Sequence, residues 1–178
     1  MKQLRSALEN LPEYCALLAA VENGGCPAAV SGLSAVHRAH FAAGIRGALG
    51  RPVVVVCAGE AEAGRMVRDL SALSGEAVDM LSAREFTFHN AAVVSRQWEH
   101  KRLRVLRALT AGECPLLVCT VEGLLQRTMP PALLAQAGEK LKLGESRSLS
   151  DLTAALAAAG YVRGDQVEGV GQFALRGG

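Results

Sequence analysis

The feature that most constrains this chain is a stretch with the layout of a phosphate-binding loop but without its chemistry. Residues 28–37 read as a short apolar strand, a turn at Gly32 and the start of a long helix. A P-loop places the pattern G-x-x-x-x-G-K-[S/T] at such a junction. Here the second glycine position is Ser34, the lysine position is Ala35 and the hydroxyl position is Val36. Without an ammonium for the phosphates or a hydroxyl for Mg²⁺, the sequence predicts a nucleotide-binding scaffold that binds no nucleotide.

Strand and helix patterns alternate along the first 137 residues. The run Val53-Val54-Val55-Val56-Cys57 is rich in β-branched residues and shows no alternation, which is typical of a parallel strand buried on both faces. The order of elements predicts an α/β fold, a parallel sheet with helices on both faces. We expect strands over 26–31, 53–57, 77–81 and 115–119, and helices over 2–22, 34–48, 60–73, 95–111, 121–127 and 130–137.

The composition changes after residue 137. Residues 139–143 alternate charged and apolar side chains and predict a half-exposed strand. Ser148 to Asp151 resembles a helix start with a capping box, followed by a helix over 149–159. Two further strands, 161–167 and 171–175, leave their sheet unfinished. We therefore expect one domain over 1–137, the first part of a small α+β domain over 138–178, and a longer protein of which this is the N-terminal fragment.

The composition gives little reason to expect nucleic acid, a membrane or a metal. The formal net charge is +2, and aromatic residues, which stack single-stranded bases, make up 4% of the chain. Five cysteines with no C-x-x-C spacing indicate reduced thiols in a cytoplasmic protein, with Cys57 and Cys119 inside apolar runs. His37 and His40 lie three apart on one predicted helix, but no third ligand follows with suitable spacing. We predict no metal and no cofactor.

Four segments of the chain resemble one protein family. They are VSGLS at 30–34, TVEGLLQRTMPP at 120–131, GYVRGDQVE at 160–168 and GQFALRGG at 171–178, the last two being the most specific. On these segments, and over nearly all of its length, the chain resembles the N-terminal region of the bacterial transcription-repair coupling factors (Mfd).

The resemblance implies a fold, a partner and a contact residue. Residues 1–137 would be a RecA-like domain with a degenerate P-loop, similar to the first domain of the excision-repair subunit UvrB. Residues from 138 would begin a small domain that binds UvrA, the damage-recognition subunit, with Arg176 matching a family arginine that contacts UvrA. RNA polymerase and DNA would be engaged only through downstream domains, so we expect no enzyme activity from this part.

One helix carries a basic face. Lys101, Arg104 and Arg107 follow at i, i+3 and i+6, so they share one side of the predicted helix. They read either as an ordinary solvated face, with Trp98, Val105, Leu106 and Leu109 turned inward, or, together with Arg96 and Arg102, as a phosphate-binding stripe that makes weak contacts to DNA. A third reading is packing against later domains of a longer protein.

Three functional hypotheses remain open from the residues. The first is a non-catalytic interaction module that recruits UvrA for nucleotide excision repair. The second is an ATP-dependent helicase or nucleotide-binding domain with an atypical loop, which Ala35 and the lack of any lysine between residues 3 and 100 oppose. The third is an α/β domain with an unrelated ligand at the carboxyl ends of its strands.

Overall fold

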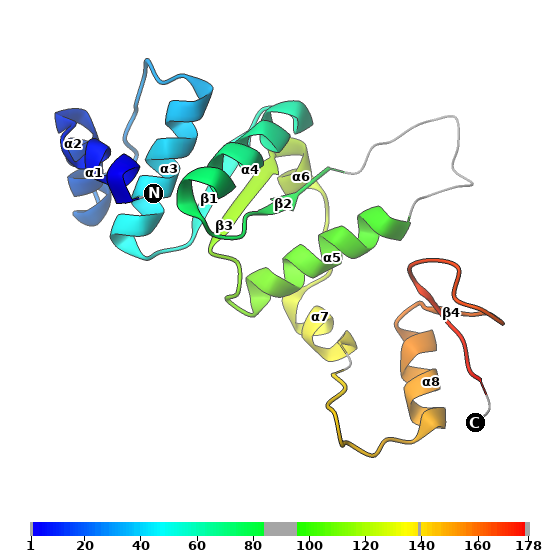
Figure 1. Ribbon diagram of the computed structural model, residues 1–178. Coiled ribbons are helices and arrows are strands. Elements are labelled where there is room, and N and C mark those ends of the chain that lie inside the picture. The colour runs from blue at the N-terminus through cyan, green and yellow to red at the C-terminus, as the bar shows by residue number, and fades with distance from the viewer. Residues whose placement is uncertain (1, 84–95, 139, 177–178) are drawn as a thin grey trace. The chain divides into compact units, whose positions relative to one another are not determined.

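The computed structural model describes residues 2–83, 96–138 and 140–176, which form two compact units. Unit 1 contains residues 1–83 and 112–126, and unit 2 contains residues 84–111 and 127–178. Together they are a mixed α/β fold with a small parallel sheet (Figure 1). The predicted domain boundary between residues 137 and 138 stays a prediction.

Unit 1 is built on a three-stranded parallel sheet in the order β1-β3-β2. Helices α3 and α4 pack against each other and against the sheet. Their small and aliphatic residues meet the strands in one core of Ala39, Cys57, Ala63, Met66, Leu70, Leu116 and Val118. The elements of the unit are α1 (Lys2–Glu9), α2 (Pro12–Glu22), α3 (Ala35–Leu49), β1 (Val53–Cys57), α4 (Glu60–Ser74), β2 (Asp79–Leu81), β3 (Leu116–Thr120) and α6 (Val121–Leu125).

The strand β1 differs from its prediction in one respect. It forms over the expected residues, but its burial alternates, with Val54 52% and Val56 50% exposed. Val53 and Val55 pack against the core under α3 and α4, whereas Val54 and Val56 point to the opposite face of this edge strand. The central strand β3 is buried at all five positions. Burial on both faces therefore holds for β3 and not for β1.

A second core joins the N-terminal helices to α3. Leu8 of α1, Tyr14 of α2 and Phe41 of α3 are buried together, and the rings of Tyr14 and Phe41 meet edge to face with centroids 5.3 Å apart. Gly44 of α3 lies beneath them, where an added Cβ would come 2.6 Å from Leu8 Cδ1 and 2.7 Å from the Tyr14 hydroxyl. A larger residue at this position would therefore have to displace the ends of the Leu8 and Tyr14 side chains.

The predicted strand over 26–31 is absent. These residues are exposed and adopt neither helix nor strand. Pro27 has no backbone N–H for a sheet ladder, and Ala28 and Ala29 offer little apolar area to bury. The chain instead crosses from α2 to α3 as an irregular segment, while the helix predicted from residue 34 is confirmed as α3.

Unit 2 contains helices α5, α7 and α8 and two short strands. Helix α5 packs against α7, and α8 packs against β4. The predicted cap of α8 is present, since the Ser148 hydroxyl accepts a hydrogen bond from the Asp151 N–H at 3.4 Å. The bounds are α5 (Arg96–Thr110), α7 (Pro131–Ala137), α8 (Leu149–Ala158), β4 (Val162–Arg163) and β5 (Gln172–Phe173).

One prediction for this unit was wrong, and the prediction of two C-terminal strands is confirmed in part. Residues 140–143 form no strand: Leu141 is 62% exposed, and a turn follows in which the Glu145 N–H donates to the Lys142 carbonyl at 3.1 Å. The strands β4 and β5 are shorter than predicted and pair in parallel, with Val162 opposite Gln172.

Candidate functional site

The segment predicted to be an emptied phosphate loop keeps the start of a helix. Gly32 has φ +79, in the left-handed region that glycine tolerates best. Ser34 is the N-cap residue of α3, but its hydroxyl lies 3.0 Å from His37 Nδ1 instead of bonding a backbone N–H. Ala35 opens the helix and Val36 is 49% exposed. Methyl and isopropyl groups therefore occupy positions 35 and 36, where the predicted alignment with a P-loop would place a lysine and a hydroxyl residue.

The carboxyl edge of the sheet, where α/β folds often bind ligands, carries acidic side chains in unit 1. Glu60 and Glu62 both lie in the first turn of α4. The Ala58 N–H, just after β1, donates to Glu62 Oε2 at 3.2 Å, and the Ala83 N–H, just after β2, donates to Glu60 Oε1 at 2.8 Å. Arg38 balances Glu62 through an ion pair of 2.9 Å. Two amides that could face a phosphate are thus bonded to carboxylates of the chain itself.

An amide that follows the third strand, β3, is also bonded to a side chain of the chain itself. The Thr120 hydroxyl caps α6 by accepting a hydrogen bond from the Gly123 N–H at 3.0 Å, and Thr120 is buried. Gly123 packs so closely on the end of β2 that an added Cβ would lie 2.7 Å from the Leu81 carbonyl oxygen. The TVEG part of the segment at 120–131 therefore closes the sheet edge.

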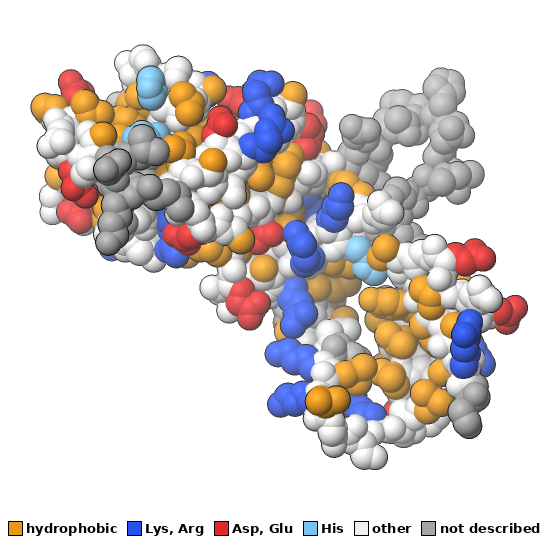
Figure 2. Space-filling model, viewed as in Figure 1, with side chains coloured by type: hydrophobic (Ala, Val, Ile, Leu, Met, Phe, Trp, Pro, Cys, Tyr) orange, Lys and Arg blue, Asp and Glu red, His pale blue; other side chains and the backbone are white. Residues whose placement is uncertain are grey.

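The predicted basic face of α5 is exposed. Lys101, Arg104 and Arg107 are all on the surface, and Figure 2 shows Lys and Arg side chains over this helix. Arg102 was expected in the same stripe, but this was wrong: its side chain is only 7% exposed, and its guanidinium lies 5.7 Å from the centre of the Trp98 ring. Burial lowers the pKa of Arg102. Three surface cations one turn apart supply a local positive field, while contact with DNA stays a prediction.

Arg176 lies on the surface just after β5. Next to it, Leu175 takes part in a shallow groove of about 460 Å³ over α8, and Arg163 of β4 lies at the same groove. Figure 2 shows hydrophobic side chains gathered over α8. The remaining groove residues are Leu149, Ser150, Thr153, Ala154 and Ala157. A cation beside an apolar groove is an arrangement suited to a protein partner.

The buried thiols are poor nucleophiles. Burial raises the pKa of Cys57, and the charges of Glu62 and Cys119 raise it further against the lowering effect of Arg38. Burial also raises the pKa of Cys119. The pKa of Cys114 reaches about 11 through burial, the charge of Asp79 and a hydrogen bond to it. Because the thiolate is the reactive form, these cysteines are inert packing residues at neutral pH.

Three His, Cys, Asp or Glu side chains arranged to hold a metal ion do not occur in the described part of the chain. Nor does any helix among the described residues have the length and apolar character needed to cross a membrane.

Two curated proteins match this chain. The chain is 25% identical to the transcription-repair-coupling factor of Bacillus subtilis over 180 residues, which cover 100% of the chain and 15% of that protein. It is 29% identical to the transcription-repair-coupling factor of Myxococcus xanthus over 159 residues, covering 82% of the chain and 13% of that protein. No family model matches the chain.

The predicted resemblance to transcription-repair coupling factors is confirmed. The chain spans about one seventh of the length of these relatives. Both matches run over most or all of the chain, which fits a single region of a much longer protein, such as its N-terminal part.

Sequence reasoning missed the two carboxylates at the sheet edge. Their signal was present, because Glu60 and Glu62 follow Gly59 directly after a strand, and acidic residues in a first helical turn favour bonds to nearby amides. It also missed Arg163 and Leu175 as neighbours of the α8 groove, since the parallel pairing of β4 with β5 could not be foreseen.

Proposed function

We propose that this chain is a non-catalytic N-terminal module of a transcription-repair coupling factor, and that it recruits UvrA for transcription-coupled nucleotide excision repair. Its first part is a RecA-like domain whose phosphate loop is degenerate, and its last part begins the UvrA-binding domain. RNA polymerase and DNA are engaged by other regions of the longer protein.

The similarity along the whole chain carries this proposal. The position of Arg176 supports its finer part, because the side chain is exposed and the fold leaves it available to a partner. A guanidinium forms two directed bonds to a carboxylate, and arginine is enriched among residues that dominate binding energy at interfaces. The groove with Arg163 and Leu175 extends the same surface.

The chemistry of unit 1 argues against the alternative of a nucleotide-binding enzyme. The loop at 32–36 offers no cation to a phosphate, and the carboxylates of Glu60 and Glu62 lie at the edge of the sheet. A phosphate brought to that edge would meet negative charge and amides that already have partners. A nucleotide would have to overcome repulsion by these carboxylates and displace them from the amides that they accept bonds from. Neither cost affects the binding of a protein partner.

The proposal is tested by measuring UvrA affinity with Arg176 changed. Arg176→Ala is expected to weaken binding by about 2 kcal/mol, roughly a thirtyfold increase in Kd. Arg176→Lys keeps the charge but loses the planar fork, so it is expected to recover only part of the loss. The measurement is biolayer interferometry with immobilised UvrA, using this chain and a longer version that continues past Gly178.

The matched control is Arg51→Ala, which removes one exposed arginine from unit 1. Circular dichroism of each variant checks that the fold is intact, since an exposed arginine changes stability by no more than about 0.5 kcal/mol. If Arg176→Ala and Arg51→Ala bind UvrA equally well, the contact assigned to Arg176 is wrong. If neither length of the parent chain binds UvrA, the recruiting role is wrong.

A further inference from the structure

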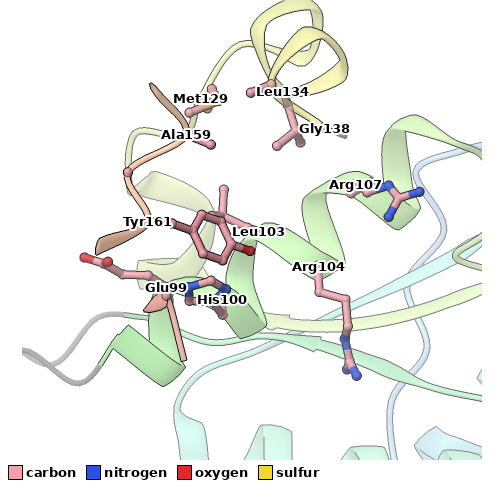
Figure 3. Close-up of a pocket in the computed structure, with 13 residues that line it drawn as sticks. Glu99, His100, Leu103, Arg104, Arg107, Met129, Leu134, Gly138, Ala159 and Tyr161 are labelled. Carbon is pink, nitrogen blue, oxygen red and sulfur yellow. The ribbon is translucent and has the colours of Figure 1, made fainter. Parts of the chain in front are cut away.

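A second surface in unit 2 is lined by other residues than the α8 groove and has a different composition. Helices α5 and α7 and the turns before β4 and β5 enclose a cleft of about 690 Å³ (Figure 3). This volume falls within the range of about 300–1,000 Å³ typical of ligand pockets. The cleft is lined by Glu99, His100, Leu103, Arg104, Arg107, Met129, Leu134, Ala137, Gly138, Ala159, Gly160, Tyr161 and Gly171.

Apolar side chains line the centre of the cleft, and two aromatic rings form one of its walls. His100 and Tyr161 meet edge to face, with ring centroids 5.9 Å apart and planes at 82°. Leu103 projects toward the same space from α5, and Leu134 faces it from α7 (Figure 3). Leu103 is 37% and Met129 43% exposed, so the cleft has apolar area left to bury. Such a space is large enough to accept a bulky apolar side chain of a peptide.

The rim of the cleft is mainly basic. Arg104 and Arg107 line it, and in Figure 3 their side chains extend outward along α5 from the apolar centre. Glu99 supplies the acidic member of the lining, and Lys101 lies on the surface of the same helix. A ligand that places an apolar group in the centre therefore meets net positive charge on the α5 side.

We propose that this cleft binds an acidic peptide segment of a partner protein, with one phenylalanine or leucine side chain in the apolar centre and carboxylates toward Arg104 and Arg107. The proposal does not rest on UvrA recruitment. The apolar centre supplies most of the affinity, and the arginines at the rim supply steering and salt dependence. DNA, which would use the same arginines, has no need of the apolar centre.

The experiment uses short synthetic fluorescein-labelled peptides and the 178-residue chain, with binding followed by fluorescence anisotropy. The first peptide has a central phenylalanine flanked by glutamates. In the second peptide serine replaces the phenylalanine, and in the third lysines replace the glutamates. We expect the first to bind, and the second to bind at least about tenfold more weakly because one large apolar side chain is no longer buried. The third should not bind, because its charge matches that of the rim.

Matched variants place the binding at the cleft. Leu134→Ser should weaken binding of the first peptide about tenfold, whereas Leu133→Ser, an exposed neighbour on α7 outside the lining, should not. Arg107→Ala should weaken it about threefold and reduce its salt dependence, whereas Arg65→Ala, an exposed arginine of α4, should not.

Three outcomes would overturn the proposal. One is equal binding of the phenylalanine and serine peptides. Another is no difference between Leu134→Ser and Leu133→Ser in chains whose circular dichroism is unchanged. The third is binding of a DNA duplex that depends on Arg107 but not on Leu134, with no binding of the acidic peptide, which would make the surface a nucleic-acid contact.

Discussion

The substitution Gly123→Ala tests how tightly α6 closes the edge of the sheet. An added Cβ would lie 2.7 Å from the Leu81 carbonyl oxygen, about 0.7 Å closer than the 3.4 Å at which ordinary contact begins. The obstacle is backbone, and Leu81 is held in β2 opposite Cys119 of β3. Overpacking of this kind costs about 1–3 kcal/mol, and the better helix propensity of alanine returns at most about 1 kcal/mol. We expect a net loss of about 1–2 kcal/mol.

Gly64→Ala is the matched control, because it makes the same chemical change in a helix of the same unit. Gly64 lies within α4 and an added Cβ there meets nothing within 4 Å, so alanine should stabilise the chain by about 0.5–1 kcal/mol. Urea unfolding followed by far-UV circular dichroism measures both changes. A Gly123→Ala chain as stable as the parent would refute the close packing of α6 on β2.

Three further predictions concern ligands and thiols. Calorimetry with Mg²⁺-ATP should detect no binding, because the loop at 32–36 has no cation and carboxylates occupy amides at the sheet edge. A low-micromolar affinity would contradict this reasoning. DNA affinity should be weak and should vanish by about 200 mM salt, because it would depend on phosphate contacts alone; tight binding at that salt would contradict this. Cys15 and Cys26, which are exposed, should be alkylated first at pH 8, while Cys57, Cys114 and Cys119 should react only on unfolding, as mass spectrometry can show. The raised pKa of Cys114 stabilises the fold fully below pH 9.0, and this contribution should be lost as the pH rises through about 11.

Much of unit 1 could be predicted because its elements carry strong local signals. The run at 53–57 and the run at 115–119 are long enough and apolar enough to specify β1 and β3. The face of Ala63, Met66 and Leu70 specified α4, and all three side chains are buried. Sequence could not show which strand occupies the centre of the sheet, because both runs have the same pattern. The exposure of Val54 could therefore not be predicted without knowing that β1 lies at an edge of the sheet.

The C-terminal part was predicted less well because hydrogen bonds to a side chain shape the connection between its strands. Two short strands separated by a few residues ordinarily pair as an antiparallel hairpin. Here the side-chain oxygen of Gln172 accepts hydrogen bonds from the N–H groups of Glu168 and Gly169 at 2.9 and 3.1 Å, which folds the connection back on itself. Beyond this connection, β5 lies alongside β4 in the parallel direction. No pattern of hydrophobic residues signals such a bond.

The segments that carry the family resemblance divide into two physical kinds. In the segment at 120–131, Thr120 caps a helix and Gly123 fits against a carbonyl, so packing alone explains these residue types. At Arg176 packing explains nothing, since the side chain is exposed and lies beyond the last strand. Since the fold does not require an arginine at this position, the variant Arg176→Ala tests a role in binding with little effect on stability. The residue types of Thr120 and Gly123 thus follow from the fold, whereas the contact of Arg176 with UvrA stays a prediction.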